Sequence, residues 1–180
     1  MKKIIALILA LTLMLALCAC GAKDEAKPES GAADVQLEGT LSEIMAQVYK
    51  KAPETEMAMG EPLPIDTADA DAVKYYLGLD SAEGIKEAVF SEPMIGSIAY
   101  SVCLVRCEEG ADVETIKKSI SDNVDARKWI CVVAEKVIVN NCGDVVILIM
   151  ADEATATGVY DAFKEIAGEG LGTVIERAGE

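Results

Sequence analysis

The chain lacks histidine altogether and has few aromatic side chains. None of its 180 residues is His, and only 4% are Phe, Trp or Tyr. Histidine is the commonest general base and the commonest metal ligand, and aromatic rings form the platforms on which sugars and bases stack. These absences disfavour imidazole-based catalysis, imidazole metal sites and recognition by stacking.

Basic residues are also scarce. Lys and Arg number 16 against 31 Asp and Glu, which gives a formal charge of −15 at pH 7. A chain this acidic repels phosphate backbones and anionic lipid surfaces. We therefore expect no nucleic-acid partner and no basic membrane-docking face.

Motifs for known chemistries are missing as well. The sequence contains no GxSxG and no P-loop, and the glycine-rich stretch 168–172 follows a helical pattern without opening a new helix. We predict no catalytic residue, no cofactor-binding residue, no cofactor and no metal ligand. Segment 54–71 leaves calcium open as an alternative to a solvated acidic loop. Its six carboxylates are Glu54, Glu56, Glu61, Asp66, Asp69 and Asp71.

Among the features that the sequence does contain, the first is an N-terminal leader. Lys2 and Lys3 precede an uncharged run over 4–17, and Leu17-Cys18-Ala19-Cys20-Gly21 follows. This order is typical of a secretory signal peptide, because the run is too short to span a bilayer. Its end resembles a bacterial lipobox, which implies that cleavage leaves Cys20 as a lipidated N-terminus. Cys18 is the competing cysteine, and an ordinary or uncleaved leader is the other alternative.

The sequence divides into three parts. Residues 1–19 are the predicted lipoprotein signal peptide, and residues 20–37, made up largely of Lys, Asp, Glu, Ala and Gly, are a predicted disordered tether. About fifteen flexible residues have a mean reach of roughly 20 Å. Residues 38–180 form a single predicted α+β domain.

The first helix of that domain has a clear start. Thr40-Leu-Ser-Glu43 is a capping box, in which each side chain satisfies a free backbone donor. Leu41, Ile44, Met45, Val48 and Ala52 then fall on one face, and Pro53 ends the helix. A shorter helix, capped by Asp69 and ended by Gly78, is predicted through Val73, Tyr76 and Leu77.

From residue 87 the pattern alternates between strands and helices. Strands are predicted over 87–91, 97–106, 137–140 and 145–150, with a hairpin turn at 141–144. Helices follow the caps Asp112 and Asp152, and the tail after Gly168 should fray. The ββαββα order predicts a four-stranded antiparallel sheet with helices on one face, preceded by the N-terminal amphipathic helix. Residues 129–133 have no clear assignment.

Four cysteines belong to the predicted domain: Cys103, Cys107, Cys131 and Cys142. Cys103 and Cys107 share a predicted strand at a separation of roughly 13 Å, too far for a disulfide between them. Buried free thiols are the favoured interpretation. Disulfides with the other cysteines, or a thiol nucleophile at Cys131 or Cys142, remain alternatives.

Several of these features occur together in one family. The Lys-Lys leader, the lipobox ending Cys20-Gly21, the acidic tether, the strand 97–106 and Asn141-Cys-Gly-Asp-Val-Val-Ile-Leu-Ile-Met150 resemble an uncharacterised family of Gram-positive lipoproteins, domain of unknown function four-three-five-eight. The resemblance covers about residues 37–167. It implies the cellular location and supplies no catalytic residue.

These observations predict a function only in outline. We expect a protein held on the extracytoplasmic face of the cell membrane through the lipid on Cys20, acting as a non-enzymatic binding or interaction module, with an envelope protein as a possible partner. The alternatives are an envelope hydrolase that uses carboxylates or a thiol, and an assembly factor for an envelope complex.

Overall fold

The computed structural model describes residues 35–52 and 60–179. All of them lie in one compact unit that spans Ala32–Glu180. The predicted signal peptide, the lipidation site Cys20 and the tether up to residue 34 lie outside the described residues. Within the described ranges, no helix combines the length and apolar character needed to cross a membrane.

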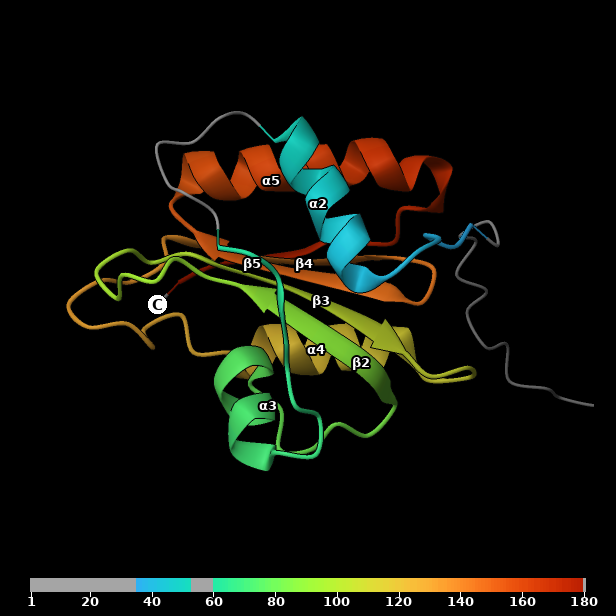
Figure 1. Ribbon diagram of the computed structural model, residues 1–180, viewed down its shortest axis with the longest axis horizontal. Helices are drawn as coiled ribbons and strands as arrows, with labels where there is room; N and C mark the ends of the chain where they lie inside the picture. The colour runs from blue at the N-terminus through green and yellow to red at the C-terminus, as the bar shows by residue number, and fades with distance from the viewer. Residues whose placement is uncertain (1–34, 53–59, 180) are drawn as a thin grey trace, which may run out of the picture. The chain divides into compact units, whose positions relative to one another are not determined.

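The unit is built on one six-stranded sheet (Figure 1). The strands are β1 (Leu63–Pro64), β2 (Ile85–Ser91), β3 (Ser101–Cys107), β4 (Lys136–Cys142), β5 (Val145–Ala151) and β6 (Ile175–Ala178). Their order in the sheet is β1-β2-β3-β5-β4-β6, and every neighbouring pair is antiparallel. All seven residues of β5 are buried, as expected for a central strand.

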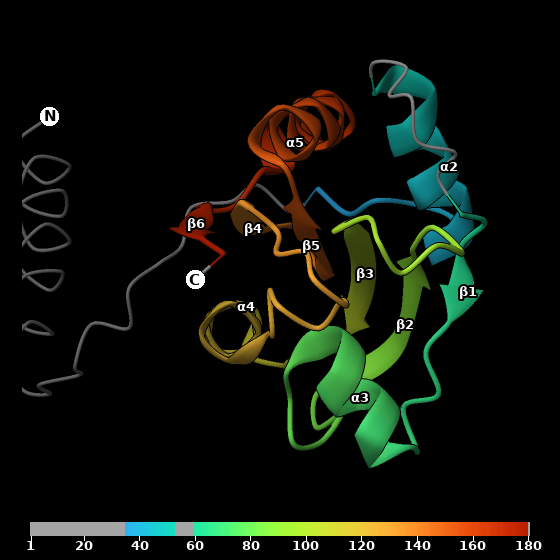
Figure 2. The same ribbon diagram turned by 90° about the vertical axis from the view of Figure 1, so that its left-hand side faces the viewer.

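Four helices in the described residues cover both faces of this sheet: α2 (Leu41–Lys51), α3 (Ala70–Leu77), α4 (Val113–Asn123) and α5 (Glu153–Ala167). Successive residues of a strand point to opposite faces, so Val102 and Leu104 of β3 pack in the core beneath α2 and α5. Cys103 and Val105 pack in the other core, with α3 and α4. Figure 2 shows the sheet between these two pairs of helices.

The predicted four-stranded sheet with helices on one face is therefore wrong. The structure is α+β, but it adds β1 and β6 at the two edges and places helices on both faces. β1 is only two residues long and ends in Pro64, so it carries no strand pattern. β6 alternates half-buried and exposed residues and gains its order from distant contacts.

The predicted helix starts are confirmed. Thr40 and Glu43 form the capping box of α2, and Asp69 begins α3, which ends at Gly78 with φ 72°. Asp112 and Asp152 accept hydrogen bonds from backbone amides in the first turns of α4 and α5. Each cap satisfies amide donors that the first turn of a helix leaves unpaired.

The C-terminal segment is ordered, which contradicts the predicted fraying. β6 pairs with β4, and Arg177 donates to the carbonyls of Ser121 and Val124 near the end of α4. Lys117 of α4 is fully buried, and its Nζ donates to Asn141 Oδ1 at 2.8 Å and to the carbonyl of Thr173 at 2.7 Å. These bonds and the strand pairing fasten residues 173–178 to both α4 and β4.

Candidate functional site: the apolar tip

Two loops project from one end of the sheet. The first, residues 92–100, joins β2 to β3, and the second, residues 124–135, joins α4 to β4. The strand register places them together, because Ser101 at the start of β3 pairs with Met150 and Lys136 at the start of β4 pairs with Ala151. Figure 1 shows both loops at the left-hand end of the molecule. We call this end the apolar tip.

The tip exposes large apolar side chains that the cores would normally bury. Met94 is fully exposed and Ile130 is 79% exposed. Ile95, Val133 and the thiol of Cys131 are exposed beside them. Contact with a partner that removes such a side chain from water contributes about 1.5–3 kcal/mol when burial is complete.

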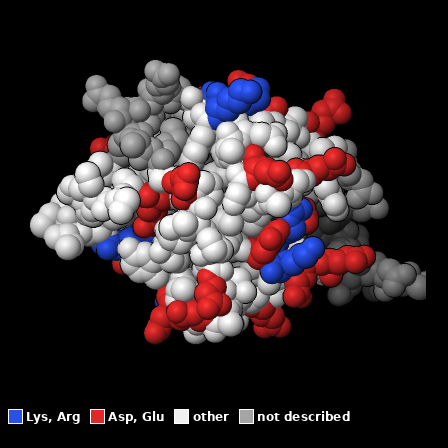
Figure 3. Space-filling model, viewed as in Figure 1, with Lys and Arg blue, Asp and Glu red and all other residues white. Residues whose placement is uncertain are grey.

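Negative charge is absent from the outer part of the tip. Residues 93–99 carry no charge, and residues 126–134 contain Arg127 and Lys128 but no acid. In Figure 3 the corresponding left-hand end is white on its outermost part, whereas patches of acidic groups are scattered over the rest of this face. At the tip, this acidic chain therefore presents apolar side chains without carboxylates among them.

A buried ion pair joins the two loops. Lys128 Nζ lies 2.5 Å from Glu92 Oε1, and the two side chains are only 3% and 13% exposed. The contact is electrostatic, because this carboxylate oxygen has no hydrogen-bond partner of ordinary geometry within the described residues. In so dry a setting each charge depends on the other, and the pair holds the loops in a fixed relation.

Aromatic rings enclose the ammonium group. Lys128 Nζ lies 4.6 Å from the ring centroid of Tyr75, 5.1 Å from that of Tyr76 and 5.3 Å from that of Trp129, within the range of cation–π attraction. Tyr76 also stacks on Phe90 of β2 at 3.9 Å. Burial, with the nearby Glu92 carboxylate, raises the pKa of Tyr76 to about 12, so this hydroxyl stays neutral.

The backbone reinforces the second loop. The amide of Ala134 donates to the carbonyl of Ala126 at 3.0 Å, which closes residues 127–133 into a projection. Cys131 lies in this projection with φ 64°, a left-handed conformation that non-glycine residues seldom adopt. The exposed apolar side chains are thus carried by a braced structure.

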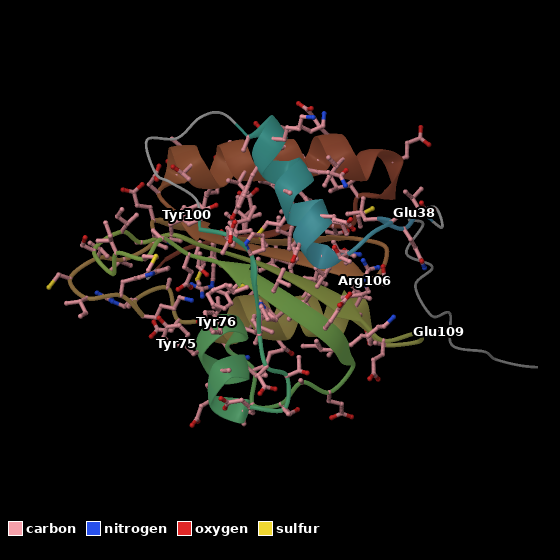
Figure 4. The ribbon with its side chains drawn as sticks, viewed as in Figure 1. Glu38, Tyr75, Tyr76, Tyr100, Arg106 and Glu109 are labelled. Carbon is pink, nitrogen blue, oxygen red and sulfur yellow. The ribbon has the colours of Figure 1, made fainter. Side chains whose placement is uncertain are left out.

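The opposite end of the sheet is arranged around Arg106. Its guanidinium donates to Glu87 at 3.1 Å, to Asp144 at 3.3 Å and to the carbonyl of Gly39 at 2.8 Å. The carbonyl of Val35 accepts a weak bond from the Cys142 thiol. Figure 4 shows Arg106 toward the end of the molecule opposite Tyr75 and Tyr76. The chain therefore enters the folded unit at the end remote from the tip.

The residues that lead into α2 already belong to the folded unit. Leu37 packs against the first core. Gly143, at φ 55° in the β4–β5 turn, approaches so closely that an added Cβ would lie 2.7 Å from the carbonyl oxygen of Val35. The last residues assigned to the tether therefore contact the domain.

The four domain cysteines are free thiols. Cys103, Cys107 and Cys142 are buried as predicted, whereas the expected burial is wrong for Cys131. Burial raises the pKa of Cys103 and of Cys107 to about 11 and also raises that of Cys142. A raised pKa disfavours the nucleophilic thiolate at these three positions.

A groove of about 470 Å³ lies between the α3–β2 connection and α4. Three acidic residues line it: Asp80 accepts from Lys74 at 2.7 Å, Asp112 caps α4, and Glu83 is exposed. The Lys74 hydrogen bond lowers the pKa of Asp80, the opposite of what a general acid needs. Two of the three carboxylates therefore have structural partners.

The acidic segment does not gather around a common point in its described part. Asp66 accepts from the amide of Ala68, and Asp69 accepts from those of Asp71 and Ala72. Across residues 35–52 and 60–179, no cluster of three or more His, Cys, Asp or Glu is placed to hold a metal ion. Glu54 and Glu56 lie outside those ranges.

Sequence reasoning missed the tip. Met94, Ile95 and Ile130 look like core residues in the sequence, because apolar side chains are usually buried. Two signals were available: Glu92-Pro93 and Gly96 mark a turn, and no helix or strand could be assigned over 129–133. Apolar residues in segments without regular structure are candidates for exposure.

No protein-family model, no curated protein and no solved structure matches this chain. The resemblance to the Gram-positive lipoprotein family stays a prediction.

Proposed function

We propose that the protein is a lipid-anchored, non-enzymatic interaction module on the extracytoplasmic face of the cell membrane, and that it binds its partner through the apolar tip. The observation that carries the binding role is the exposure of Met94, Ile95 and Ile130 on loops braced by a buried ion pair. Exposed apolar side chains on a rigid frame lower the ordering cost of binding.

The proposed location rests on the leader and lipobox sequence. Cys20→Ala should abolish lipid labelling and release the protein from the membrane fraction. Cys18→Ala is the matched control and should remain labelled and membrane-bound. Retention of the label in the Cys20 variant would contradict the anchor.

The binding face is tested by position-specific crosslinking in intact cells. A photo-reactive residue in place of Ile95 should form adducts that are lost when Ile130→Glu is added. The same residue in place of Val174, which is 38% exposed away from the tip, is the control and should form none of these adducts. Equal adducts at both positions would contradict a binding role of the tip.

A further inference from the structure

The point at which the chain enters the domain limits which partners the tip can reach. Val35 lies beside the β4–β5 turn, and the tip lies at the other end of the same strands. The seven residues of β4 alone span about 23 Å, whereas the predicted fifteen-residue tether has a mean reach of roughly 20 Å. A tether of this reach holds the entry end near the anchoring membrane and leaves the domain free to turn its tip toward a neighbouring copy.

The distribution of charge allows a second copy of the chain to approach the tip. Two copies of a chain with formal charge −15 repel each other over most of their surfaces. The outer tip is free of acids, and the Glu92 carboxylate at its base is paired with Lys128. Charges farther back than about 10 Å are screened at ordinary ionic strength, so tip-to-tip approach avoids most of the repulsion.

We propose that the tip binds the tip of a second copy of this chain. In a twofold arrangement the loop with Met94 and Ile95 of one copy packs on the loop with Ile130 of the other, and each pair of contacts occurs twice. The proposal rests on the tip being the binding face, as in the proposed function above.

The anchor sets the strength of this association. Two loops per copy make an interface below the size of stable dimers, so the contact is weak between free molecules. Copies held on one membrane share a thin layer, which raises their effective concentration. The dimer should therefore form on membranes and dissociate in dilute detergent.

Cys131 provides a native probe. It is the exposed thiol among the described cysteines and lies on the projecting loop beside Ile130. Membranes that carry the full chain are treated briefly with copper phenanthroline and run on non-reducing gels. We expect a disulfide-linked dimer that Cys131→Ser abolishes.

Surface variants then separate specific contact from collision. Met94→Glu should lower the dimer yield about tenfold or more, the effect of losing one well-buried apolar side chain. Val174→Glu should leave the yield unchanged. Met94 lies on the other loop, so neither substitution should change access to Cys131. Maleimide labelling of Cys131 should therefore be equal in the wild type, Met94→Glu and Val174→Glu. A yield that Met94→Glu does not change, or no dimer at all, overturns self-association.

The same membrane samples distinguish a second copy of the chain from two other partners of the tip, a different protein and the lipid bilayer. If no Cys131 dimer forms but the Ile95 photoprobe captures a different protein, the second copy is overturned while the tip remains a binding face. Trp129 is the chain's one tryptophan, so quenching of its fluorescence by brominated lipid would assign the tip to the bilayer and also overturn self-association. No partner in any of these experiments overturns both proposals.

Discussion

The two ends of the sheet use one kind of interaction for opposite purposes. At the entry end, Arg106 binds half-exposed carboxylates and a backbone carbonyl, and it fastens the incoming chain to β2, β3 and the β4–β5 turn. At the tip, Lys128 is almost wholly buried against Glu92 and holds two loops whose apolar side chains face water. One ion-pair cluster secures the fold, and the other supports an exposed surface.

The difference separates side chains that stabilise the fold from side chains that are available for binding. Both hydrophobic cores lie between the sheet and its helices and are complete without Met94 or Ile130. Exposed apolar residues on loose loops need no explanation beyond chance. A dry ion pair beneath them is costly to build, which argues that their position matters.

The largest contrast between the ends is expected in thiol reactivity. Cys131 at the tip should be alkylated within minutes by N-ethylmaleimide in the native protein. Cys142 at the entry end should react more slowly by a factor of roughly 10³ or more, because it is exposed only when the fold opens. Peptide mass spectrometry over time follows each site. Equal rates at the two cysteines would remove the contrast.

Next in size is the loss of the tip's ion pair. Lys128→Met leaves the Glu92 carboxylate buried without a counter-charge and should lower the free energy of unfolding by about 3–5 kcal/mol. Urea denaturation measures the change. The double variant Lys128→Met/Glu92→Leu is the control and should recover most of the loss. A single variant that costs under about 1 kcal/mol would mean that the pair is effectively solvated.

Arg106→Lys should have a smaller effect. It keeps the charge but removes the planar fork that reaches three acceptors, so we expect a loss of about 1–2 kcal/mol. Amide exchange should also rise in the first turn of α2, which follows the Gly39 contact. A loss as large as that of Lys128→Met would make the two ends energetically alike.

The smallest effect concerns alkaline pH. The pKa of Tyr76 is raised to about 12, so the folded state keeps a proton that the unfolded chain loses near pH 10. This contribution to stability is complete below pH 10 and declines as the pH rises toward 12. Urea midpoints at pH 9 and 11 should therefore fall less in Tyr76→Phe than in the wild type. An identical fall would exclude Tyr76 as a cause.

Local signals in the sequence predicted local structure well. Thr40, Asp69, Asp112 and Asp152 each begin the helix expected of them, because a cap depends only on the next three residues. Strand β3 is buried on both faces, under α2 and α5 on one side and with α3 and α4 on the other. The predicted one-sided arrangement of helices missed this, because a strand buried on both faces has no alternation that tells where the covering helices come from.

Contacts between residues far apart in the chain could not be predicted from the sequence. β6 is ordered by Arg177 and Lys117, whose partners lie 24 to 56 residues away in sequence. The tip depends on Lys128 meeting Glu92, which lies 36 residues earlier in the sequence, and neither residue differs locally from a surface charge. Such pairings are set by the assembled sheet, so no short window of sequence contains them.

The placement of β6 has a consequence for the synthesis of the chain. One edge of β4 has no strand beside it until residues 175–178 arrive, and the buried ammonium of Lys117 lacks one of its acceptors until Thr173 does. Those residues follow every other strand of the sheet in the sequence. The sheet therefore stays incomplete until they have left the ribosome, however early the first strands have formed.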